Sequence, residues 1–107
     1  MKVKVPPQVR IGCHDYNICF NKHLWHDDKL AGSVNHRTHM IQIDPAFQLS
    51  ELDATLIHEI IHIVVRIFSC QAEEADIDRL SEGMGEFLLN NLGIEFDWSN
   101  ISEIVDK

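Results

Sequence analysis

Two histidines and a glutamate stand at the spacing H-E-x-x-H, as His58, Glu59 and His62. Histidines four positions apart lie on one face of a helix, one turn above the other, so both imidazoles can reach a single ion. The glutamate beside the first histidine is then well placed to take a proton from a metal-bound water. The pattern therefore predicts a zinc ion (Zn2+) held by His58 and His62, with Glu59 as the catalytic base.

The residues around this motif are apolar, which strengthens the prediction of a metal. Residues 56–68 form an apolar stretch that is interrupted by His58, Glu59, His62 and Arg66. Burying two imidazoles and a carboxylate without partners costs free energy, and a bound metal would remove that cost. The alternative is a helix with two hydrogen-bonded histidines and a glutamate on its surface.

A catalytic zinc site needs a third protein ligand and one open position. The next predicted helix offers four acids, namely Glu73, Glu74, Asp78 and Glu82. Helices rise about 1.5 Å per residue, so an antiparallel helix returns to the level of His62 near Glu74, whereas Glu82 lies too far along. Asp78 shares a face with Glu74, which suits a carboxylate that orients a ligand histidine. We prefer Glu74 as the third ligand, with Glu73 and Asp78 as the alternatives.

Two helices in the second half of the chain are expected to carry these residues. We expect Ser50 to be the N-cap of the first helix, whose apolar residues recur with a helical period at Leu52, Leu56, Ile60, Ile63 and Ile67. The second helix should begin between Ser69 and Glu73 and run to about Asn91. The run Asn91-Leu92-Gly93 is typical of a helix that stops there.

Strands and turns are expected in the first half of the chain. Residues 8–12 and 16–20 are short apolar-rich runs around a predicted tight turn, and residues 38–43 have a strand pattern. Residues 21–28 are expected to form a loop, and Gly32-Ser33 a turn. Together the elements predict an α+β fold, in which a small antiparallel or mixed sheet packs on two helices that carry the site.

Composition narrows the functional class. The chain has 107 residues, a net charge of −8 and no cluster of Lys and Arg, which argues against a nucleic-acid partner. We expect one domain, residues 1–93, and an apolar tail, residues 94–107, that packs on the domain or on a partner. The start of the chain lacks the apolar run of a secretory signal, and no apolar stretch is long enough to span a membrane. Three cysteines without C-x-x-C spacing are typical of reduced thiols, so we expect a cytoplasmic protein, either a monomer or a homodimer.

The run His58-Glu59-Ile60-Ile61-His62, followed by Glu74-Ala75-Asp76-Ile77-Asp78, resembles the gluzincin zinc metallopeptidases, which have H-E-x-x-H and a downstream E-x-x-x-D. The run from Glu73 to Met84 also resembles the small zincin-like metallopeptidases of phages and prophages, which are related to the single-domain minigluzincins, and the resemblance covers about residues 38–92. The resemblance implies a hydrolase that cleaves peptide bonds with zinc held by the two histidines and Glu74. It also implies that residues 38–43 form an edge strand that pairs with an extended peptide or protein substrate.

Gluzincins usually add a histidine or tyrosine that donates a hydrogen bond to the oxyanion formed during hydrolysis. Tyr16 is the one tyrosine of the chain, and His36 and His39 lie around the predicted edge strand. For each histidine, an ordinary surface position is the alternative.

Two other functions fit the same residues. In the first, zinc stabilises a non-catalytic protein-interaction module. In the second, the chain is a latent peptidase that is blocked by its own tail from Ile94 onward.

Overall fold

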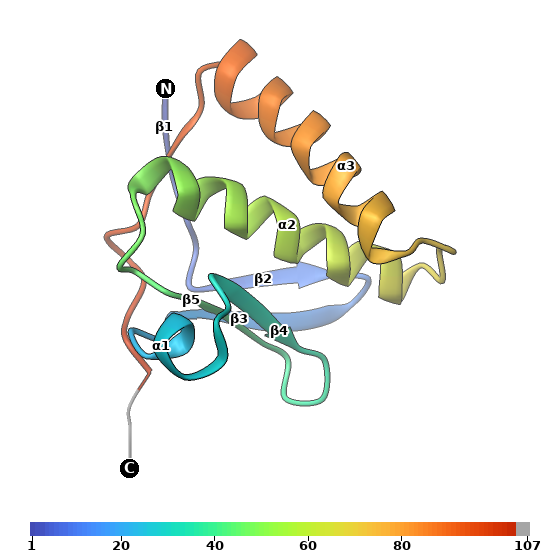
Figure 1. Ribbon diagram of the computed structural model, residues 1–107, viewed down its shortest axis with the longest axis horizontal. Helices are drawn as coiled ribbons and strands as arrows, with labels where there is room; N and C mark the ends of the chain where they lie inside the picture. The colour runs from blue at the N-terminus through green and yellow to red at the C-terminus, as the bar shows by residue number, and fades with distance from the viewer. Residues whose placement is uncertain (105–107) are drawn as a thin grey trace.

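The longest helix, α2 (Leu49–Ile67), lies across one face of a four-stranded sheet in a computed structural model of the chain, which describes residues 1–104 (Figure 1). The spatial order of the strands is β2 (Gln8–Ile11), β3 (His14–Phe20), β5 (Met40–Ile43) and β4 (Gly32–Asn35). The outer strands run antiparallel to their neighbours, whereas β3 and β5 are parallel. The predicted α+β fold with a mixed sheet is therefore confirmed.

The core lies between α2 and this sheet. Alternate residues of the two inner strands point at the helix, so Tyr16 and Ile18 of β3 and Ile41 and Ile43 of β5 are buried. The helix contributes one apolar face to this core, formed by Leu52, Leu56 and Ile63. This two-layer packing explains why the helical period was readable in the sequence.

A second helix, α3 (Glu74–Gly85), packs on the side of α2 that faces away from the sheet and continues as the π-helical segment η1 (Glu86–Asn91) (Figure 1). Its N-cap, Glu73, falls at the end of the predicted interval and forms a capping box with Asp76. Gly93 has a left-handed φ of 68°, as expected where a helix stops. None of the helices in residues 1–104 combines the length and the apolar character that crossing a membrane requires.

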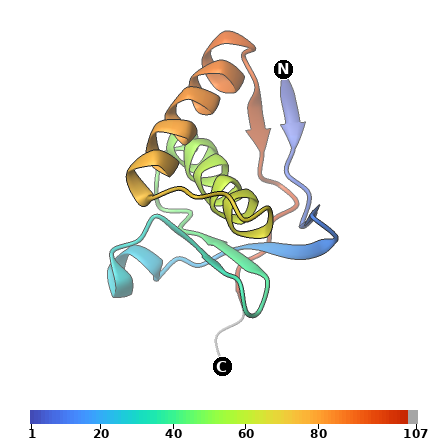
Figure 2. The same cartoon turned by 90° about the vertical axis from the view of Figure 1, so that its right-hand side faces the viewer.

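The chain beyond Gly93 returns to the domain. β6 (Glu95–Asp97) pairs in parallel with β1 (Lys2–Lys4), and Figure 2 shows the two strands side by side. Trp98 and Ile101 are buried in the core. Buried Asp53 of α2 accepts two hydrogen bonds from this segment, from the Phe96 backbone N at 3.1 Å and from Trp98 Nε1 at 2.8 Å. The last three residues of the expected tail, 105–107, lie outside the described residues.

Four local predictions were wrong. The strand expected at residues 38–43 is not at the edge, because β4 pairs along its outer side and occupies the place where a turn at Gly32-Ser33 was expected. Residues 21–28 are not all loop, because α1 (Leu24–Asp28) forms there, with Leu24 buried and the Trp25 backbone N donating to Asp44. Ser50 is not the N-cap but lies in the first turn of α2, which has Gln48 as its N-cap.

We expect Asp53→Ala to lower the free energy of unfolding by about 3 kcal/mol, because it leaves the Trp98 indole N–H buried without an acceptor. Asp15→Ala, which removes a solvent-exposed pair with Arg10, should cost about 1 kcal/mol or less. Urea unfolding of both variants measures the difference. Equal losses would show that Asp53 does not hold the C-terminal segment.

Candidate metal centre

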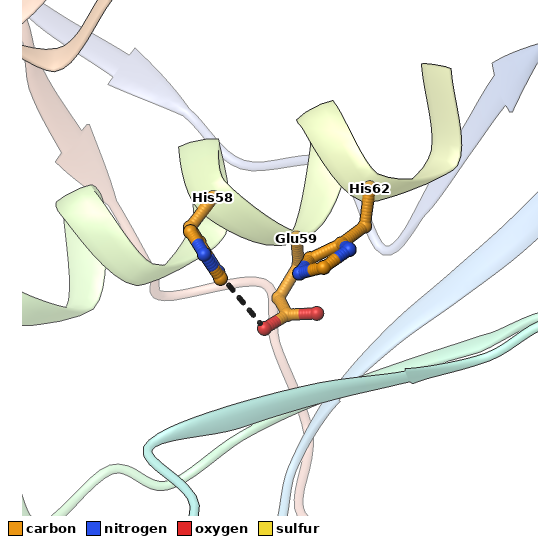
Figure 3. Close-up of side chains that lie close together, drawn as sticks. All are labelled: His58, Glu59 and His62. Atoms are coloured by element: carbon orange, nitrogen blue, oxygen red, sulfur yellow. Dashed lines mark ion pairs between the residues drawn. The ribbon is translucent and has the colours of Figure 1, made fainter. Parts of the chain in front are cut away.

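The phase of α2 decides where the three motif side chains point. Glu59 follows Leu56 by three positions and precedes Ile63 by four, so it lies on the helix face that covers the sheet. His58 and His62 lie on the adjacent flank of the helix, and about three-quarters of each side chain is buried. Figure 3 shows Glu59 pointing from α2 toward the strands, with one histidine on each side of it. The two imidazole rings are 4.7 Å apart between centroids and lie edge to face.

Glu74 and Asp78 of α3 face the histidines of α2. Glu74 Oε1 lies 3.3 Å from His58 Nε2, and Glu74 Oε2 lies 3.4 Å from His62 Nε2. Asp78 Oδ1 lies 2.9 Å from His58 Nε2. The structure thus brings together all five residues of the predicted site. Within residues 1–104, Glu73 makes no hydrogen bond or ion pair with these five residues, because it is the N-cap of α3, where its backbone N–H donates to Asp76.

The position of Asp78 differs from the role that we expected for it. A carboxylate that orients a ligand histidine binds the ring nitrogen that faces away from the metal. Asp78 instead approaches His58 Nε2, which is the nitrogen that Glu74 also approaches, while His58 Nδ1 lies 3.5 Å from Glu59. This geometry favours Asp78 as a second candidate ligand beside Glu74.

Part of the donor set has the spacing of zinc ligands, although His58, His62 and Glu74 do not together form one group with all ligand atoms within 4.8 Å of one another. Ligands about 2.0–2.1 Å from a tetrahedral zinc lie about 3.3 Å from each other, which matches the distances between Glu74 and both histidines. In residues 1–104, two trios bring ligand atoms within 4.8 Å of one another, namely His58–Glu59–His62 and His58–Glu74–Asp78. Glu74 connects the trios because its carboxylate reaches both imidazoles. Nitrogen and carboxylate oxygen are ligands that zinc accepts.

Glu59 is buried, with 8% of its side chain exposed. Burial raises the pKa of its carboxyl, and the nearby charges of His62 and His58 oppose this rise in part. A carboxyl group with a raised pKa can accept a proton near neutral pH and release it again. Glu59 therefore has the environment of a general base.

The edge strand β4 runs close to α2 beside the motif. A Cβ atom on Gly32 would lie 2.5 Å from Thr55 Cγ2, so only glycine permits this approach. A hollow of about 460 Å³ lies between them, and its walls include Gly32, Thr55, His58, Glu59 and Asp78. Sequence reasoning missed β4 because a glycine followed by serine is typical of a turn. The signal for it was the strand pattern at residues 40–43, which needs a partner on each side to be fully buried.

A second group of rings lies between β3 and the β4–β5 connection. The Tyr16 hydroxyl lies 3.5 Å from His36 Nδ1, and the ring of His39 lies 4.8 Å from that of Tyr16. Burial lowers the pKa of His36, and the charges of Arg66, His62 and His39 lower it further. The charge of His62 thus reaches His36, and Nδ1 of His36 faces the Tyr16 hydroxyl.

The described part of the tail lies away from the histidines. Residues 95–97 pair with β1, and Phe96 and Trp98 donate to Asp53 toward the N-terminal end of α2. Residues 102–104 lie beside Phe20 at the end of β3. The walls of the hollow beside His58 come from residues 29–32, α2 and α3. Within the described residues, the tail therefore does not cover the hollow in the way that a latent enzyme would require.

Comparison with protein-family models, with curated proteins and with solved structures finds no match for this chain. Function is therefore inferred from the motif and from the geometry around it.

We expect the purified protein to bind about one zinc ion per chain and to melt at a higher temperature with zinc than with a chelator. Elemental analysis of His58→Ala, His62→Ala and Glu74→Ala should show zinc well below one per chain, because each variant removes a donor. His26→Ala on exposed α1 is the matched control and should keep its zinc. Zinc retained by Glu74→Ala and lost by Asp78→Ala would move the third ligand to Asp78.

Glu59→Gln should stabilise the metal-free protein at neutral pH. The raised pKa of Glu59 means that, as pH rises from 4.5, the unfolded chain ionises before the folded one, so stability falls through this window. Glutamine removes the cost of burying the charge, so the variant should gain on the wild type as pH rises and show no such gain near pH 4. Urea unfolding with chelator across this range measures the gain. A constant difference at all pH values would contradict the assignment.

Proposed function

We propose that this protein is a zinc-dependent metallopeptidase that hydrolyses peptide bonds. The observation that carries the proposal is the convergence of Glu74 on both motif histidines, at 3.3 and 3.4 Å, beside a buried glutamate. His58, His62 and Glu74 would hold the ion, with Asp78 as the alternative carboxylate ligand. Zinc in such a site activates water and polarises the carbonyl group of the substrate.

Glu59 takes the proton of the attacking water and passes it to the leaving amine. Its burial supports this role, because burial raises its pKa toward the working pH. A site that only stabilises the fold has no need of a buried carboxylate next to its ligands, and such a carboxylate is costly to keep.

The peptide substrate is proposed to bind along β4 rather than along the strand that the sequence indicated. β4 pairs with β5 on one side only, so its other side offers backbone groups to an extended chain. The close approach that Gly32 permits places this strand beside Glu59 and His58. His36 follows β4 directly and is the candidate donor to the oxyanion.

The cellular compartment is part of the proposal. Cys13, Cys19 and Cys70 are all free thiols, which supports a reducing compartment such as the cytoplasm. The acidic charge of the chain supports a peptide or protein partner rather than a nucleic acid.

A second candidate function is a protein-interaction module that zinc stabilises without catalysis. The observation in its favour is that Ile77 is the one buried residue of α3, so contacts to His58 and His62 are a large part of what fixes this helix. A metal there would join two helices whose apolar contact is thin.

Glu59→Gln separates the two functions. We expect the variant to keep its zinc and to lose cleavage of a mixed peptide library by at least about a hundredfold, because a general base contributes about 10²–10⁴ in rate. Glu103→Gln, at an exposed position, is the control and should cleave like the wild type. Cleavage that is undiminished in Glu59→Gln would refute this mechanism, and a zinc-loaded wild type that cleaves nothing would favour the interaction module.

A further inference from the structure

A larger hollow, of about 690 Å³, opens next to the candidate metal centre. Figure 1 shows α2 and α3 close together near the C-terminal end of α2 and separating toward its N-terminal end, and the hollow lies in this angle. It shares Ala54, Ser81 and Glu82 with the hollow beside His58, so the two spaces adjoin. Its volume is that of a typical ligand site. A peptide bound at the metal centre therefore has an adjoining space for one of its side chains.

The walls of this larger hollow combine apolar surface with negative charge. Its apolar part comes from both helical layers and from β6, through Leu49, Leu89, Ile94 and Phe96. Three exposed carboxylates also line it, those of Glu82, Glu86 and Glu95, against the single ammonium group of Lys2. None of the ion pairs in residues 1–104 involves these three glutamates. The fourth acid, Asp53, already accepts hydrogen bonds from Phe96 and Trp98.

We propose that the larger hollow binds a lysine or arginine side chain of the substrate, close to the peptide bond that is cleaved. This inference rests on the proposed peptidase function, and it names the substrate class of that site. The aliphatic part of a long basic side chain packs on the apolar wall while its cationic end meets Glu82 and Glu86. An acidic side chain would be repelled there, and the net charge of −8 extends the preference to the approach of the peptide.

Two glycines of the same helix provide a matched test. A Cβ atom on Gly83 or on Gly85 would meet no other atom within 4 Å, but only Gly85 lines the larger hollow. Gly85 has the helical angles φ −60° and ψ −45°, so Gly85→Leu suits the helix and places its side chain in the hollow. Gly83→Leu adds the same side chain to the same helix outside the hollow.

The experiment measures binding and cleavage separately. Binding is measured in the zinc-loaded Glu59→Gln background by fluorescence anisotropy, with two labelled peptides of Ala, Ser and Thr that differ only in a central lysine or norleucine. We expect the lysine peptide to bind about fivefold more tightly, as befits partly screened ion pairs, and to lose this advantage at high salt. Gly85→Leu should weaken both peptides, and the double change of Glu82→Gln and Glu86→Gln should remove the preference. Gly83→Leu and Glu103→Gln should change neither.

Cleavage of the mixed peptide library by the wild type then shows which proposal fails, if either does. A preference for lysine in binding without cleavage supports the subsite and overturns the peptidase. Cleavage without enrichment of lysine or arginine near the cut bonds supports the peptidase and overturns the subsite. Equal affinity for the two peptides, binding of neither, or an equal effect of Gly83→Leu and Gly85→Leu also overturns the subsite.

Discussion

Burial of one face of α2 against the sheet is the constraint on which the rest of the molecule depends. The rotation of the helix about its axis is fixed by the buried residues Leu52, Leu56 and Ile63. Because successive residues are about 100° apart, this rotation determines the direction in which each motif side chain points. Glu59 falls on the buried face, and the two histidines fall on the flank, where α3 can reach them. The same packing that stabilises the domain therefore sets a buried carboxylate beside two imidazoles that are about three-quarters buried.

The contact between α3 and α2 is mainly polar, unlike the contact between α2 and the sheet. α3 buries one apolar side chain, Ile77, and meets α2 through imidazoles and carboxylates instead. Glu74, Asp78 and Glu59 surround His58, so the pair of helices gathers more negative than positive charge at this point. A divalent cation reverses that balance, and its binding energy would add directly to the stability of the helix pair. In the proposed metal-bound protein, packing of α3 on α2 and binding of the metal would therefore stabilise each other.

The sequence predicted the parts of the structure that have a local cause. The helical period from Leu52 to Ile67 and the return of the chain to Glu74 follow from residue spacing alone, and both are seen in the structure. Features that depend on residues far apart in the chain could not be predicted from the sequence. Gly32 lies in a strand because it pairs with β5 and fits closely against Thr55 of α2. Asp53 can be buried because Phe96 and Trp98 donate hydrogen bonds to its carboxylate. Asp78 was expected to orient a ligand histidine, but it approaches Nε2 of His58, because spacing along a helix does not set the rotation of an imidazole ring.

The parallel pairing of β1 with β6 has a consequence for how the domain forms. Lys2 pairs with Glu95, so this contact spans nearly all of the described chain, and closing so long a segment is slow compared with forming either helix. Until it closes, Asp53 lacks the indole and backbone donors that neutralise its burial. In a folding chain, α2 would therefore form before the hydrogen bonds to Asp53 that fix it against the C-terminal segment. Closure of this long-range contact would then also complete the fold around the proposed metal centre.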